Sequence, residues 1–338
     1  MKKFIAICSG FFITLVVAVM AAWGMLAIYY SDYQNETLKT CCAGLFGIAT
    51  LSAFILLPNR RRTLVWFGVV FAALVAWWSL IEPSNSRDWQ DDVAVLPYAD
   101  IQGDRVTIHN IRNFTYRTES DFDARYYDRT FDLNKLDSLD LITSHWMGDA
   151  IAHVMLSFGF GGADYVTFSI EIRKEKTEAY SVIKGFFKQY ELVYVVGDER
   201  DLIRLRTSYR NDDVYMYRLR MPPERRRLLF MEYVKKINKL KEKPEFYNTL
   251  TTNCTTNVVT HVQAFGGSLR YTWKILLSGY TPQYVYELGG LDTSLPFEML
   301  RKISFINERA NQAGNDPGFS EKIREGLPMP GGLQAGRE

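Results

Sequence analysis

Histidine and cysteine are scarce in this chain of 338 residues, which contains four of each. The sequence has no CxxC or HExxH pattern and no glycine-rich phosphate loop. It therefore lacks the ligand sets typical of metal sites and the loop typical of nucleotide sites, and we expect no metal and no other cofactor. The net charge of +2 is too balanced to indicate a nucleic-acid partner.

Charged side chains are absent from three long apolar runs, Phe4–Tyr29, about Thr40–Leu57, and Leu64–Ile81. About 20 apolar residues suffice for a helix to cross a bilayer. The first run exceeds the ~7–15 residues usual for the apolar part of a cleaved signal peptide, and two further runs follow it. Trp77 and Trp78 suit the aromatic belt at a membrane surface. We therefore predict that residues 1–82 form a membrane anchor of three transmembrane helices.

Lysine and arginine are concentrated on one side of these predicted spans. Lys2 and Lys3 precede the first span, and the motif NRRR, residues 59–62, joins the second span to the third. Loops rich in Lys and Arg remain in the cytoplasm. This pattern predicts a cytoplasmic N-terminus and places residues 83–338 outside the cytoplasm.

The sequence beyond residue 82 is typical of an ordinary globular domain. Two runs rich in β-branched and aromatic residues, 150–160 and 164–175, are separated by Gly-Gly-Ala, which predicts a β-hairpin. We predict an α+β domain over residues 83–310, in which an antiparallel sheet packs on helices. The tail, residues 311–338, is rich in glycine and proline and is predicted to be disordered.

Cys254 is the only cysteine beyond the predicted anchor, so its domain offers it no disulfide partner. A single cysteine outside the cytoplasm is either incidental and buried or a reactive thiol. Asn253 is a good N-cap for a helix that begins at Cys254. In the first turn, the helix dipole favours a thiolate, and free N–H groups could stabilise an oxyanion. Asn253 and Thr255 are therefore candidates for substrate or oxyanion support.

The base for such a thiol must come from a small set of histidines. His109 lies in an early predicted strand, and His261 is seven residues beyond Cys254, too far along the same predicted helix. His145 and His153 remain. His153 lies in the middle of an apolar strand, where a core histidine with a purely structural role is the usual alternative.

The predicted hairpin gives His153 a partner. If the turn is centred on Gly162, residues equally distant from it face each other, and Glu171 lies opposite His153, nine residues from the turn on either side. A histidine opposite a carboxylate is the arrangement of a base and the group that orients it. A buried structural His–Glu pair is the alternative interpretation.

Four segments, AHVMLSFGF, YVTFSIEIRKEK, DERDLIRLR and NCTTN, resemble the domain family named after the periplasmic domain of Lnb, a bacterial lipoprotein N-acyltransferase. The resemblance covers roughly Ser120–Leu288. The order of a strand histidine and an acid, followed by a cysteine at a helix start, is also similar to the permuted NlpC-like papain fold. Lecithin retinol acyltransferase and its relatives share that order.

The resemblance implies a thiol-dependent acyltransferase of the bacterial inner membrane, with a cytoplasmic N-terminus and a periplasmic C-terminal domain. It implies Cys254 as nucleophile, His153 as base and Glu171 as its partner, while His145 remains a candidate for support. The expected partners are a phospholipid acyl donor and, as acceptor, the N-terminal amine of a lipoprotein or another amine. Two alternatives stay open: an extracytoplasmic cysteine hydrolase that cleaves cell-wall peptide or lipid, and a non-catalytic membrane-anchored binding module.

Overall fold

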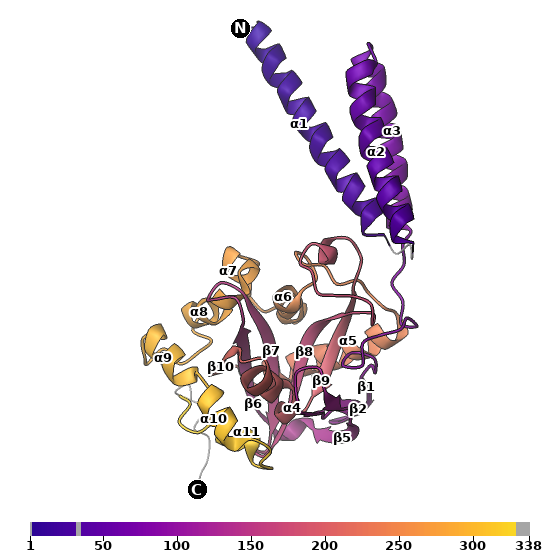
Figure 1. Cartoon of the computed structure of the whole chain (residues 1–338). Coiled ribbons are helices and arrows are strands. Elements are labelled where there is room, and N and C mark those ends of the chain that lie inside the picture. Colours follow the sequence, from indigo (N-terminus) through magenta and orange to yellow (C-terminus); the bar gives the residue numbers. More distant parts are fainter. Residues whose placement is uncertain (1, 32–34, 329–338) are drawn as a thin grey trace. The chain divides into compact units, whose positions relative to one another are not determined.

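The computed structural model describes residues 2–31 and 35–328 of the chain. It divides into two compact units (Figure 1). The first unit comprises Met1–Ser84 together with Ala179–Glu191, and the second comprises Asn85–Glu178 together with Leu192–Glu338. A loop from the middle of the sequence therefore belongs with the N-terminal helices.

Three long helices in the described part of the first unit are α1 (Lys2–Tyr29), α2 (Glu36–Leu56) and α3 (Arg60–Ser79). Each is long and apolar enough to cross a membrane, so three long apolar helices form where the sequence predicts them. The side chains of Asn35 and Asn59 accept hydrogen bonds from the N–H groups of Leu38 and Arg62 and so begin α2 and α3. Large apolar side chains stay exposed along all three helices, as lipid contact requires.

The second unit is built around an eight-stranded sheet with the order β1-β2-β9-β8-β7-β6-β10, in which β5 also pairs with β2. The strands are β1 (Tyr98–Gln102), β2 (Arg105–Arg112), β5 (Tyr126–Asp132), β6 (Leu136–His145), β7 (Ala152–Phe160), β8 (Asp164–Arg173), β9 (Glu191–Gly197) and β10 (Asp213–Arg218). A separate small ladder joins β3 (Thr115–Tyr116) and β4 (Phe122–Asp123).

The predicted α+β class is confirmed, although the sheet is mixed and not purely antiparallel. The hairpins β1–β2, β6–β7 and β7–β8 are antiparallel. Strand β9 instead runs parallel to β2 where Arg112 pairs with Gly197. The loop of the first unit separates β8 from β9 in sequence, so β9 enters the sheet from a long connection and not from a tight turn.

The β7–β8 hairpin has the register that its turn predicts. Met155 pairs with Ser169, and Phe160 pairs with Asp164, so the turn is centred on Gly162. Gly161 and Gly162 have positive φ angles of 62° and 75°. Because side chains disfavour that conformation, the two glycines fix both the turn and the pairing beyond it.

Helices complete the second unit. They are α4 (Glu199–Arg204), α5 (Pro223–Glu242), α6 (Cys254–Ala264), α7 (Trp273–Leu276), α8 (Thr281–Glu287), α9 (Phe297–Ser304), α10 (Asn307–Ala313) and α11 (Phe319–Lys322). Shorter turns are η1 (Leu133–Lys135), η2 (Lys184–Phe186), η3 (Leu205–Tyr209) and η4 (Ser278–Tyr280), of which η2 lies in the loop of the first unit and η3 is a π-turn.

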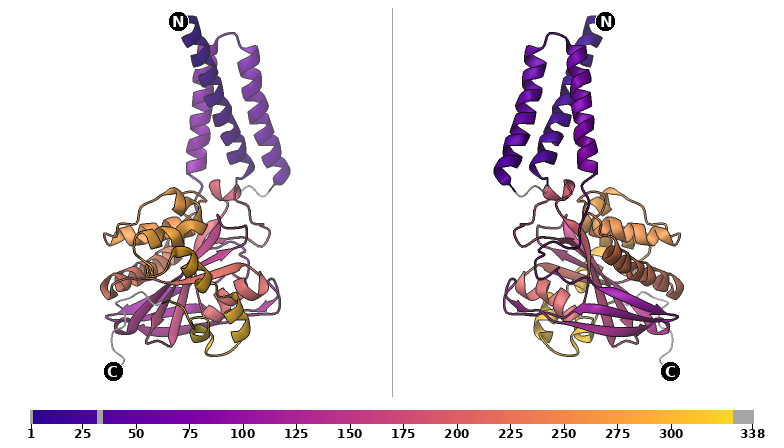
Figure 2. Two further views of the ribbon diagram at one scale, coloured as in Figure 1. Left: turned by 90° about the vertical axis from the view of Figure 1, so that its left-hand side faces the viewer. Right: turned by 90° about the vertical axis from the view of Figure 1, so that its right-hand side faces the viewer.

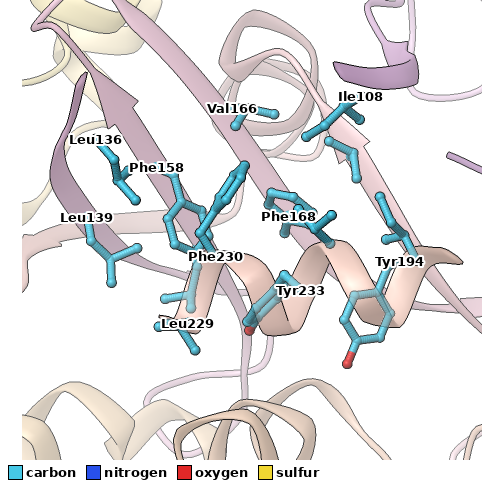
Figure 3. Packing of buried hydrophobic residues seen from close by; sticks show 14 of the residues in the cluster. Ile108, Leu136, Leu139, Phe158, Val166, Phe168, Tyr194, Leu229, Phe230 and Tyr233 are labelled. Atoms are coloured by element: carbon cyan, nitrogen blue, oxygen red, sulfur yellow. The ribbon is translucent and has the colours of Figure 1, made fainter. Parts of the chain in front are cut away.

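The main hydrophobic core lies between the sheet and α5. Phe230 and Tyr233 of α5 pack against Phe158 and Phe168 of the hairpin (Figure 3). The ring centroids of Phe158 and Phe230 are 5.1 Å apart, in an edge-to-face arrangement. This packing supports β7 and β8, whose ends carry His153 and Glu171.

The predicted disordered tail is wrong from Asn311 to residue 328, because α10 and α11 occupy much of it; residues 329–338 lie outside the described residues. Phe319 and Ile323 are buried in a second core cluster with residues of the sheet. Arg324 forms an ion pair with Glu199, with 2.6 Å between Nη2 and Oε1. Glycine-rich composition misleads here because burial of a few apolar side chains orders the segment.

Candidate active site

Cys254 is the first residue of α6, as predicted, and a capping box fixes that position. Asn253 Oδ1 accepts hydrogen bonds from the N–H groups of Thr255 and Thr256 at 3.0 and 2.9 Å. In return, Thr256 Oγ1 accepts from the N–H of Asn253 at 2.8 Å. The helix therefore starts at one defined residue, which places the thiol in the first turn.

Asn253 and Thr255, the residues on either side of Cys254, stabilise the start of α6. Asn253 Nδ2 donates to the carbonyl of Thr249, and the buried hydroxyl of Thr255 donates to the carbonyl of Ile275 at 2.9 Å. Because Asn253 already occupies the N–H groups of Thr255 and Thr256, they are not free to bind an oxyanion. The N–H of Cys254 itself has no hydrogen-bond partner within the described residues, so it is the first-turn donor that remains.

His153 and Glu171 meet at the ends of β7 and β8. His153 Nε2 lies 3.2 Å from Glu171 Oε1 and 2.6 Å from Ser169 Oγ. The hydroxyl of Ser169 in turn donates to Glu171 Oε1 at 2.6 Å. These contacts occupy Nε2 and orient the ring, which leaves Nδ1 as the nitrogen for a second partner.

Cys254 is the other neighbour of His153, and its side chain is among the groups that raise the pKa of this histidine. One segment connects the two residues structurally. Ser278 Oγ, in η4, accepts from the N–H of Ala152 at the start of β7 at 2.9 Å. The carbonyl of Ile275, in α7, accepts from Thr255 in the first turn of α6. The α7–η4 segment therefore sets how the thiol approaches the imidazole.

Arg206 is a site residue that the sequence reasoning did not assign. Its guanidinium is 3% exposed, and Nη2 donates to Glu171 Oε1 at 2.7 Å. Nη1 donates to the carbonyl of Leu202 at 2.8 Å, which orients the fork within η3. Arg206 lies in the DERDLIRLR segment, but no local spacing links that segment to Glu171. Ser169, by contrast, could have been found, because it precedes Glu171 by two residues and so shares its strand face.

The electrostatics of the site favour a charged pair. Burial opposes protonation of His153, but the charge of Glu171 and the nearby side chains of Cys254 and Glu171 raise the pKa of His153 to about 9. Burial also disfavours the carboxylate, yet His153 and then Arg206 hold the pKa of Glu171 well below its usual value. At neutral pH, therefore, an imidazolium lies beside the Cys254 thiol.

His145 is not brought to this site. In the β6–β7 ladder, Ser144 pairs with His153, whereas His145 pairs with Ala152. Paired residues share a face and successive residues alternate, so His145 and His153 point to opposite faces of the sheet. The ring of His145 instead meets that of Tyr215 edge-on, with centroids 5.4 Å apart.

No group of three or more His, Cys, Asp or Glu side chains in residues 2–31 and 35–328 is arranged to hold a metal ion.

Part of the chain is similar to a known domain family. Residues 122–279 match the Lnb N-terminal periplasmic domain. The family resemblance drawn from the sequence is thereby confirmed, over a range that includes Cys254, His153, Glu171 and Arg206. No curated protein and no solved structure matches the chain. With its three helices long enough to span a bilayer, the chain is a membrane protein whose C-terminal domain is periplasmic.

Proposed function

We propose that this protein is a membrane-anchored acyltransferase that works through an acyl-Cys254 thioester. The single observation that carries the proposal is the placement of Cys254 beside His153, which is itself paired with Glu171 and, through it, with Arg206. A thiol needs a neighbouring base or cation to attack a carbonyl carbon at neutral pH. His153 supplies that group, and the carboxylate keeps it oriented.

The first half-reaction transfers an acyl chain from a phospholipid to the enzyme. The Cys254 thiol first loses its proton to water, and the neighbouring His153 imidazolium stabilises the thiolate that remains. The thiolate attacks the ester carbonyl carbon, and a C–S bond forms as the carbonyl π bond opens to an oxyanion. The N–H of Cys254 stabilises the oxyanion of the tetrahedral intermediate. The C–O bond then breaks, the lysophospholipid leaves as the alcohol, and it takes its proton from the His153 imidazolium.

The second half-reaction releases the acyl chain to an amine. The amine attacks the thioester carbonyl carbon, and neutral His153 accepts the proton that the nitrogen loses. The C–S bond breaks as the C–N amide bond forms, which regenerates the thiolate and the imidazolium. Glu171 stays ionised throughout, because Arg206 pairs with it even while His153 is neutral.

The proposed acceptor is the N-terminal amine of a bacterial lipoprotein. The match to the Lnb periplasmic domain supports this choice, and the long apolar helices support a donor that resides in the membrane. The proposal includes anchoring in the inner membrane with the N-terminus in the cytoplasm, as the Lys and Arg distribution predicts.

A cell depleted of its usual lipoprotein N-acyltransferase tests this function. With the full-length protein expressed, intact-lipoprotein mass spectrometry should show one added amide-linked acyl chain, and Cys254→Ala should abolish it. Unmodified lipoprotein amines beside well-expressed protein would refute the proposed acceptor. Loss of phospholipid acyl chains with no gain on lipoproteins would instead indicate a cysteine hydrolase.

A further inference from the structure

The loop formed by residues 179–191 packs onto the ends of the membrane helices, within the same unit (Figure 2). The hydroxyl of Tyr190 closes its base, because it accepts from the N–H of Ser181 at 2.9 Å and donates to the carbonyl of Ala179 at 2.7 Å. The ring of Phe187 stacks on that of Tyr30 at the end of α1, with centroids 5.5 Å apart. Specific contacts therefore make the loop an ordered part of the first unit.

Lys188 attaches the loop to the end of α3. Its Nζ donates to the carbonyls of Trp78, Ser79 and Ile81 at 3.0, 3.2 and 3.0 Å. The same ammonium lies 4.5 Å from the centroid of the Trp78 ring. A cation is favourable at a helix C-terminus, where the last carbonyls have no partner within the helix. Because α3 is long enough to span a bilayer, its end marks the membrane surface, and Lys188 holds the loop at that level.

The loop exposes a run of large apolar side chains at this level. Tyr180, Val182, Ile183 and Phe186 are all exposed within seven consecutive residues. The loop also contains Lys184 and Lys188 but no acidic residue before Glu191. Apolar side chains beside basic ones are typical of segments that lie in the interface of a bilayer with anionic lipids.

We propose that residues 179–191 are a fourth membrane element, a loop that inserts Ile183 and Phe186 into the lipid interface while Lys188 fastens it to α3. The occupant of the apolar surface is lipid and not a protein partner, because the surface is continuous with helices that themselves require lipid. This proposal does not depend on acyl transfer.

Photocross-linking in the full-length chain tests the insertion. A benzophenone amino acid is placed at Ile183 or Phe186, and the protein is reconstituted in phosphatidylethanolamine–phosphatidylglycerol vesicles that contain alkyne-tailed phosphatidylethanolamine. Leu228 on α5 is the matched control, since it is 48% exposed and Ile183 is 50% exposed. We expect several-fold more lipid adduct at positions 183 and 186 than at 228. Equal adduct formation at the three positions would overturn the proposal.

The role of Lys188 has its own variant. Lys188→Gln removes the cation that binds the end of α3, so lipid adducts at Phe186 should fall several-fold while those within α3 stay unchanged. Unchanged adducts at Phe186 would overturn the fastening role. Because both readouts are lipid adducts and not product, an inactive but inserted protein would separate failure of the acyl-transfer proposal from failure of this one.

Discussion

His153 and His261 are both largely buried, yet their surroundings drive their pKa values in opposite directions. His153 faces Glu171, and its pKa rises to about 9. His261 lies on the helix that Cys254 begins, and its Nε2 lies 2.8 Å from the hydroxyl of Tyr194. Burial and the charge of Lys236 lower the pKa of His261 to about 4.

The difference shows what a buried imidazole needs in order to serve a thiol. Burial alone keeps the ring neutral, as at His261. A carboxylate held ionised by a buried guanidinium reverses that effect, as Glu171 and Arg206 do at His153. Within one domain, His153 is therefore the histidine of the candidate site, and His261 is a buried histidine that serves as its control.

The largest expected effect is the loss of activity on removal of His153. His153→Ala should reduce acyl transfer by ~10²–10⁴-fold, because it removes positioned proton transfer and the cation beside the thiol. His261→Gln should retain most of the rate, since that ring is neutral and bonded to a tyrosine. Initial rates of lipoprotein N-acylation by reconstituted protein measure both. Equal losses in the two variants would break the distinction.

Glu171→Gln should have a smaller effect on rate and a diagnostic effect on its pH dependence. Without the carboxylate, the pKa of His153 falls, so the imidazolium deprotonates at lower pH. The alkaline limb of the rate profile, near pH 9 in the wild type, should move to lower pH. An alkaline limb that stays in place would mean that Glu171 does not control His153.

The hairpin and the start of α6 could be predicted from the sequence because both depend on local rules. Glycines at the turn set which residues pair, and Asn253 sets where the helix begins. Arg206 could not be predicted, because a π-turn more than thirty residues away brings it to Glu171. That contact depends on tertiary packing.

The C-terminal helices also depend on tertiary packing that the sequence does not reveal. The composition of the tail favours disorder, but Phe319 finds a buried place against the sheet, and composition does not report such a place. The likeness to the permuted papain fold stays a prediction, since no solved structure matches the chain. Likewise, the roles of Cys254, His153 and Glu171 in catalysis are proposals that the variants above address.

The contributions of the two histidines to stability should also depend on pH in opposite directions. The depressed pKa of His261 means that its contribution is present above 6.5, the ordinary value, and is lost as pH falls towards about 4. The raised pKa of His153 means that its contribution is full below 6.5 and is lost as pH rises through about 9. Thermal unfolding of the full chain in nanodiscs should show a smaller acid loss in His261→Gln and a smaller alkaline loss in His153→Gln than in the wild type. Parallel pH profiles for all three proteins would contradict this assignment.

The smallest expected effect comes from Tyr194→Phe. It removes one hydroxyl from the buried pair with His261, which should cost ~0.5–1.5 kcal/mol in the free energy of unfolding. The rate of acyl transfer should not change, because no hydrogen bond or ion pair joins either residue to Cys254 or His153 within the described part of the chain. Urea unfolding together with the transfer assay checks both, and a large loss of rate would place Tyr194 within the site.

The most direct test of the account is the covalent state of Cys254. Reconstituted protein is incubated with phospholipid and no amine acceptor, digested, and analysed by mass spectrometry with and without hydroxylamine. An acyl-enzyme mechanism should give a fatty-acyl mass on the Cys254 peptide that hydroxylamine removes, and no such mass in His153→Ala. Product that accumulates while no acyl-Cys254 peptide ever forms, or full activity in Cys254→Ser, would contradict it.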